Sequence, residues 1–99
     1  MFLVVFTKQA EVDKKLLKQA GLEQKAKDIL NILRYDPYKT PPRYEKLVGN
    51  LRGNISRRIN IQHRIVYEVV DNTEVLKDVD GNNYDGIVKV KRMWSHYER

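Results

Sequence analysis

Five side chains in this sequence have the chemical types needed to cleave an RNA phosphodiester bond. They are one carboxylate, two arginines, one histidine and one tyrosine: Glu45, Arg58, Arg64, His96 and Tyr97. A base removes the ribose 2′-hydroxyl proton, arginines neutralise the transition-state charge, and an acid protonates the departing 5′-oxygen. Histidine suits the acid role because its pKa of about 6.5 keeps both forms accessible near neutral pH. Almost any small basic domain holds such residues, so their types alone do not establish the activity.

The positive charge of the chain is concentrated in one block. The formal net charge is +6 over 99 residues. Residues 43–64 contribute a local +5, and residues 71–85 a local −4. A basic block beside an acidic segment predicts a polyanionic partner, which would be RNA, DNA or an acidic protein. The cations of the block are Arg43, Lys46, Arg52, Arg57, Arg58 and Arg64.

Length and composition narrow the class of protein. Ninety-nine residues suffice for one domain with one modest core, so residues 1–99 are expected to form a single domain. The sequence has no cysteine and no apolar run of 18 residues or more, which argues against disulfides, thiolate metal sites and membrane spans. We therefore expect a cytoplasmic protein that uses neither a metal nor a cofactor.

The N-terminal part predicts a strand followed by two helices. "MFLVVF" (1–6) is a continuous apolar run, which is typical of a strand buried on both faces. Thr7 is a candidate N-cap for a helix over 8–20, which Gly21 ends. A second amphipathic helix is expected over 22–34. The expected inward residues of the first helix are Val12, Leu16, Leu17 and Ala20, and those of the second are Leu22, Ala26, Ile29, Leu30 and Leu33.

After a proline-rich loop over 35–45 the hydrophobic period changes to two, which predicts strands. The runs 55–61 and 63–70 should form a hairpin, and "DGNN" (80–83) predicts a turn joining 74–79 to 86–92. The result is an α+β domain, with a twisted and mainly antiparallel sheet and both helices on one face. In 55–61 one parity holds Ile55, Ile59 and Ile61, and the other holds Ser56, Arg58 and Asn60.

The stretch "YEKLVGNLRGNISRRINIQHRIVYEV" (44–69) resembles the signature of the Txe/YoeB toxins of the RelE/ParE superfamily. The matching positions are Glu45, Leu47, Leu51, Gly53, the run Ser56–Ile59 and the run His63–Tyr67, and the terminal His-Tyr of the family is matched by His96 and Tyr97. The resemblance covers nearly the whole chain and implies a RelE-like fold of order β-α-α-β-β-β(-β). It departs from the family in an extended acidic segment at 71–86.

The resemblance implies the toxin of a type II toxin–antitoxin pair, which would cut mRNA in the ribosomal A site and contact ribosomal RNA. An acidic YefM-like antitoxin would silence it, and a second copy of the chain is a further candidate partner for the segment 71–86. By position, Glu45 matches the general base, His96 the general acid and Arg64 the arginine that stabilises the transition state. Arg58 matches a phosphate-binding arginine and Tyr97 a substrate-orienting tyrosine. The basic block adds Lys46, Arg52 and Arg57 as candidate RNA-binding residues.

Several alternatives stay open. A ParE-like chain would bind a topoisomerase without catalysis, and a plain RNA-binding module would show no toxicity. Glu45 would then be a salt-bridge partner, or within the family would only orient Arg64. His63 is expected to be structural, and Trp94 to anchor the C-terminal end to the body rather than to stack on a base. Tyr67 shares the parity of the isoleucines and is expected in the core.

Overall fold

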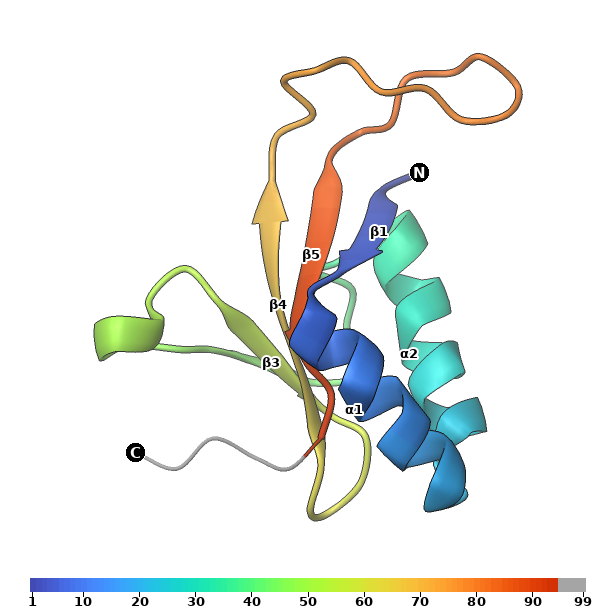
Figure 1. Ribbon diagram of the computed structural model, residues 1–99. Coiled ribbons are helices and arrows are strands. Elements are labelled where there is room, and N and C mark those ends of the chain that lie inside the picture. Colours follow the sequence, from blue (N-terminus) through green and yellow to red (C-terminus); the bar gives the residue numbers. More distant parts are fainter. Residues whose placement is uncertain (95–99) are drawn as a thin grey trace.

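The computed structural model describes residues 1–94, in which two helices cover one face of a sheet (Figure 1). The expected α+β class and element order are confirmed, with one added strand before the first predicted hairpin. The elements are β1 (Leu3–Phe6), α1 (Lys8–Gln19), α2 (Glu23–Tyr35), β2 (Tyr44–Lys46), the 3-10 turn η1 (Gly49–Leu51), β3 (Ile55–Arg58), β4 (Arg64–Val70) and β5 (Ile87–Arg92). Within the described residues the strand order is β1-β5-β4-β3-β2.

The first strand lies at an edge of the sheet, which corrects the expectation that it would be buried on both faces. β1 pairs in parallel with β5, and its four residues are only partly buried. Every other pairing, β2 with β3, β3 with β4, and β4 with β5, is antiparallel. Because helices cover one face alone, the opposite face of the β2–β3–β4 region is available for polar side chains (Figure 1).

Helix α1 begins as predicted but buries a different stripe. The Thr7 hydroxyl caps it by accepting a hydrogen bond from the Ala10 amide at 3.1 Å. Its buried residues are Ala10, Asp13 and Leu17, whereas Val12 is exposed. The buried set keeps the spacing of one helix face, although its middle member is a carboxylate. Helix α2 buries Ala26, Ile29, Leu30 and Leu33, as its periodicity predicts.

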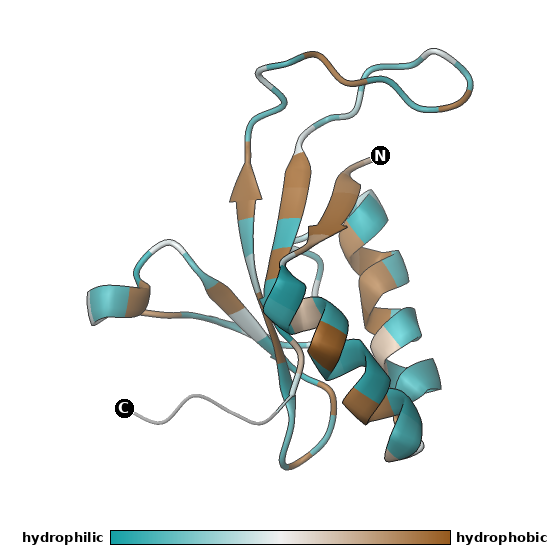
Figure 2. Ribbon diagram, in the orientation of Figure 1, coloured by the Kyte–Doolittle hydropathy of each residue, from teal (hydrophilic) through white to brown (hydrophobic). Residues whose placement is uncertain are grey.

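Alternation along β3 and β4 separates a core face from a polar face. Ile55, Ile65 and Tyr67 are buried in the core beneath the helices, as expected for their parity. Ile61 is an exception, because it lies beyond the end of β3 in the turn and is 90% exposed. The apolar strands and the largely polar outer helix surfaces are visible in Figure 2.

The acidic segment 71–86 is an excursion that turns close to the predicted position 80–83, where the Asp78 amide donates to the Asn82 carbonyl and the Tyr84 amide to the Leu76 carbonyl. The turn does not, however, join two strands of the sheet. β5 pairs with β4 and β1, so residues 74–79 do not form its partner strand. The excursion contains one isolated bridge, between Lys77 and Asn83, and it extends beyond the end of the sheet (Figure 1). Within residues 1–94, no helix is long and apolar enough to cross a membrane.

Candidate active site

Glu45, Ser56 and Arg64 meet on the sheet face that the helices leave open. Strand register places Glu45 directly beside Ser56. Arg64, on the next strand, donates a hydrogen bond from Nη1 to the Ser56 Oγ at 3.1 Å. Its Nη2 lies 3.5 Å from the Glu45 Oε1. The Arg64 side chain is 20% exposed and that of Glu45 is 38% exposed, so both groups are held in place and still open to a ligand.

A second guanidinium stands on the same face. Arg58 is the register partner of Arg64, and cross-strand partners project from the same side of a sheet. Arg58 is exposed. Two like charges directly opposite each other repel, and an anion between them relieves that repulsion. The pair therefore suits a phosphate, whose oxygens match the planar fork of arginine donors.

Arg57 occupies the other face, and its expected role in phosphate binding must be corrected. It is 0% exposed. Its guanidinium donates to the Tyr67 hydroxyl at 2.9 Å, the Pro37 carbonyl at 2.9 Å and the Pro42 carbonyl at 2.5 Å. The physical reason is parity, because Arg57 alternates with Arg58 and so shares the side of Ile55. Arg57 thus fastens the proline-rich loop to the sheet instead of facing RNA.

Tyr67 completes this internal network. Its hydroxyl donates to the Pro37 carbonyl at 2.6 Å while accepting from Arg57, and the side chain is fully buried. Burial raises the pKa of the Tyr67 hydroxyl, and the hydrogen bond and charge of Arg57 oppose that rise. The expectation that Tyr67 belongs to the core is confirmed.

Lys46 and Arg52 are placed away from the pair formed by Glu45 and Arg64. Lys46 follows Glu45 directly and is the register partner of the core residue Ile55, so it projects from the opposite side. Both cations line an open hollow of about 700 Å³ at the far end of the β2–β3 hairpin. The hollow is lined by Tyr38, Lys46, Leu47, Val48, Gly49, Arg52, Gly53, Asn54 and Ile55. These cations could contact a large polyanion, but they do not complete the site on the open face.

His96 and Tyr97, the predicted acid and its neighbouring tyrosine, lie outside the described residues. The chain leading to them is described as far as Trp94. The Trp94 ring stacks on the His63 ring with centroids 3.9 Å apart and planes at 22°. His63 is buried and directly precedes Arg64. This burial and stacking are what the expected structural role of His63 and the expected anchoring role of Trp94 require.

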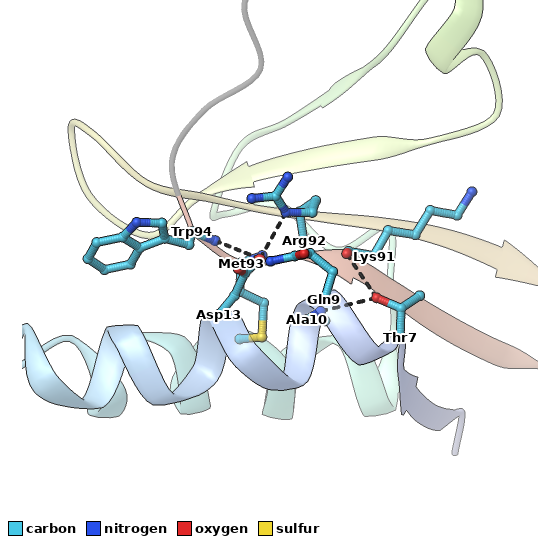
Figure 3. Close-up of polar contacts among 8 residues, drawn as sticks. All are labelled: Thr7, Gln9, Ala10, Asp13, Lys91, Arg92, Met93 and Trp94. Carbon is cyan, nitrogen blue, oxygen red and sulfur yellow. Dashed lines mark hydrogen bonds and ion pairs between the residues drawn. The ribbon is translucent and has the colours of Figure 1, made fainter.

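Asp13 is the residue that sequence reasoning missed (Figure 3). Its Oδ2 accepts hydrogen bonds from the Arg92 Nε at 3.0 Å, the Met93 amide at 2.9 Å and the Trp94 amide at 3.3 Å. Its Oδ1 accepts one from Gln9 at 3.0 Å. Burial raises the pKa of Asp13, but these hydrogen bonds and the charge of Arg92 outweigh burial, so that the pKa lies below its usual value. The sequence feature that indicates its burial is its position between Ala10 and Leu17 on one face of the helix.

Within residues 1–94, no group of three or more histidine, aspartate or glutamate side chains is arranged to hold a metal ion. Around Arg64 the described chemistry is therefore one carboxylate, Glu45, and two guanidinium groups, while the buried Ser56 hydroxyl accepts a hydrogen bond from Arg64. Such a set can bind a phosphodiester, neutralise charge that develops on it and accept a proton.

Comparison with known proteins assigns this architecture to a family. The family model of the YoeB-like toxin of bacterial type II toxin–antitoxin systems matches residues 6–79. Toxin YoeB of Synechocystis sp. is 44% identical over 59 residues, which are 60% of this chain and 62% of that relative. That alignment thus spans less than two thirds of the relative.

Two solved structures extend the likeness over nearly the full chain. The YoeB/ParE toxin from Agrobacterium tumefaciens has a TM-score of 0.78 at 23% identity, covering 97% of this chain and 100% of that one, and supports the fold alone. A chain of the heterotetrameric YoeB–YefM toxin–antitoxin complex from Staphylococcus aureus has a TM-score of 0.70 at 28% identity, covering 98% and 99%.

Proposed function

Because the chain belongs to the family of YoeB-like toxins of bacterial type II toxin–antitoxin systems, we propose that it is an endoribonuclease that cleaves mRNA on the ribosome. The observation that carries the proposal is the open-face cluster, in which Arg64 bonds to Ser56 and pairs with Glu45 while Arg58 stands opposite. This cluster offers a phosphate two guanidinium groups and sets a carboxylate beside them.

In the proposed reaction, the ribose 2′-oxygen loses its proton to a base and attacks the adjacent phosphorus. The bond from phosphorus to the 5′-oxygen breaks, and the acid His96 gives that oxygen a proton. The products are a 2′,3′-cyclic phosphate and a 5′-hydroxyl. Arg64 and Arg58 neutralise the negative charge that builds on the phosphate oxygens, a contribution commonly worth a factor of about 10² to 10³ in rate. Tyr97 would orient the substrate beside the acid.

Glu45 has two possible roles that the geometry allows. As the base, it would take the 2′-hydroxyl proton directly. As a positioning group, it would only hold the Arg64 fork through the contact at 3.5 Å. Glu45→Gln separates these roles, because the amide oxygen still accepts a hydrogen bond from Arg64 but no longer acts as a base. A rate loss of about a hundredfold or more assigns the base role, and a loss below about tenfold assigns the positioning role.

The partners proposed for this toxin follow from its charge. Arg58 and the cations beside the hollow, Lys46 and Arg52, would contact phosphates of mRNA and ribosomal RNA. An acidic, YefM-like antitoxin would cover the same basic hairpin and compete with RNA for it. The S. aureus YoeB–YefM complex supports this assignment by analogy.

The test is cleavage of a defined mRNA on purified, programmed ribosomes. The expected product carries a 2′,3′-cyclic phosphate or the 3′-phosphate derived from it. A matched mRNA with one 2′-deoxynucleotide at the cleaved position should resist cutting there, because the nucleophile is missing. Cleavage of that deoxy position at the normal rate would refute 2′-hydroxyl attack, and intact mRNA at high toxin concentration would refute the nuclease assignment.

A further inference from the structure

The excursion over residues 71–86 presents an apolar side chain between two acids. Val79 is fully exposed and lies between Asp78 and Asp80 in the sequence. A second valine of the excursion, Val75, is 53% exposed. Residues 71–85 carry a local charge of −4. The excursion therefore offers a partner both apolar surface and negative charge.

Hydrogen bonds hold the excursion in one shape. The Asp78 carboxylate accepts hydrogen bonds from the amides of Asp80 at 2.9 Å and Asn82 at 3.0 Å. Nearer the sheet, the Asn72 side chain donates to the Tyr84 carbonyl at 3.2 Å. A segment that is already ordered loses less conformational entropy when it binds, so this shape favours docking as a preformed unit.

The hollow at the far end of the β2–β3 hairpin has the complementary character. Its lining includes the apolar side chains Leu47, Val48 and Ile55 and the cations Lys46 and Arg52. No acid is among the nine residues that line it. An apolar surface flanked by two positive charges suits an apolar side chain flanked by two negative ones.

Both halves of this match lie on one chain, and their charges are not used within it. Within residues 1–94, neither the two cations of the hollow nor the two acids beside Val79 form an ion pair. The excursion repels RNA and acidic proteins and is attracted to a basic surface. The hairpin block 43–64, with a local charge of +5, is such a surface. Figure 1 shows the excursion and η1 at separate ends of the molecule, so a contact between them joins two copies.

We propose that the excursion of one copy docks in the hollow of a second copy of the chain. Val79 packs on the apolar lining, and its two flanking aspartates face the two cations. Each copy carries both halves, so a twofold pair makes the contact twice. The docked excursion covers Lys46 and Arg52, so the pair and the RNA-bound form exclude each other. This exclusion rests on the proposed function, whereas the contact itself does not.

The test is sedimentation equilibrium of the full chain over a range of concentrations. In about 0.1 M salt we expect a reversible dimer, which dissociates as the salt is raised to about 1 M and the Debye length falls from about 10 Å to about 3 Å. Val79→Ser, Asp80→Lys and Arg52→Glu should each raise the dimer dissociation constant about tenfold or more, because each removes a central contact twice. All three positions are exposed, so circular dichroism should be unchanged.

Two comparisons separate this contact from a general effect of charge. Asp28→Lys changes the net charge as Asp80→Lys does, but on the exposed surface of α2, and should dimerise like the unmodified protein. A mixture of Asp80→Lys and Arg52→Glu should recover the association that each variant loses alone, since one partner keeps an acidic excursion and the other a basic hollow. A single-stranded RNA oligonucleotide should disperse the unmodified dimer.

A monomer at every concentration would overturn the proposal, and so would a dimer that none of the three variants weakens. Failure of the mixed variants to associate would do the same. If Asp80→Lys alters binding of the antitoxin and leaves the dimer intact, the second copy is the wrong occupant. An oligonucleotide that binds without dispersing the dimer would refute the exclusion of RNA. Absence of mRNA cleavage would refute the proposed function, and sedimentation would still decide whether the contact exists.

Discussion

Replacing Arg57 by alanine should destabilise the protein strongly without removing an RNA contact. The guanidinium is fully buried and donates hydrogen bonds to the Tyr67 hydroxyl and to the carbonyls of Pro37 and Pro42. All three bonds would be lost, but the Pro37 carbonyl would still accept from the Tyr67 hydroxyl, so we count the cost of only two of them. At about 1.5 kcal/mol or more for each bond from a charged donor, the free energy of unfolding should fall by about 3 kcal/mol.

The neighbouring arginine provides the control. Arg58 lies one residue away in the same strand but is exposed on the open face. Arg58→Ala should leave the urea midpoint nearly unchanged and weaken RNA binding. Arg57→Ala should lower the urea midpoint and, under conditions where the variant is fully folded, bind RNA as the unmodified protein does. Both midpoints can be read from urea unfolding followed by circular dichroism, provided that the m-values agree. Equal stability of Arg57→Ala and Arg58→Ala would refute the assignment of the two faces.

Three further predictions concern elements outside that network. The pKa of Asp13 is lowered in the folded chain. Its ionisation therefore contributes stability that is fully present above the ordinary pKa of about 3.9 and is lost as pH falls through the folded pKa. In Asp13→Asn, the unfolding free energy should consequently decrease less steeply with falling pH below about pH 4 than in the unmodified protein. Thr7→Ala removes the cap of α1 and a hydrogen bond to the Lys91 carbonyl, and calorimetry should show a loss of about 1 kcal/mol or somewhat more. Replacing residues 74–83 by a short turn should preserve the fold, because β4 and β5 pair directly. The same replacement should weaken association with the antitoxin or with a second copy of the chain, measured by sedimentation. Unchanged association with both would contradict an accessory contact made by this segment.

The alternation of apolar and polar residues predicted side-chain direction correctly in strands that have one face against the core. It predicted correctly that Arg58 and Arg64 would share the open face and that Tyr67 would be buried. The same alternation places Arg57 on the inward face, but its positive charge favoured the prediction that it binds phosphate on the outward face. Backbone carbonyls from the proline-rich loop satisfy the guanidinium, and a sequence does not show which loop will supply such acceptors.

Features that depend on distant pairing could not be predicted. The parallel pairing of β1 with β5 makes β1 an edge strand, although its apolar run indicated a central one. The burial of Asp13 could not be predicted for the same reason. A carboxylate on the inner face of a helix is stable only when hydrogen-bond donors from other elements reach it. Those donors belong to residues 92–94, at the other end of the chain.

The central claim is that Arg64, held by Ser56 and Glu45 on the open sheet face, stabilises the transition state of RNA cleavage. The most direct measurement is the single-turnover rate of mRNA cleavage on ribosomes by Arg64→Gln, compared with Arg34→Gln on α2, which removes an arginine away from the site. We predict that Arg64→Gln cleaves at least about a hundredfold more slowly than the unmodified protein and that Arg34→Gln cleaves at its normal rate. Equal rates for Arg64→Gln and the unmodified protein would contradict the claim.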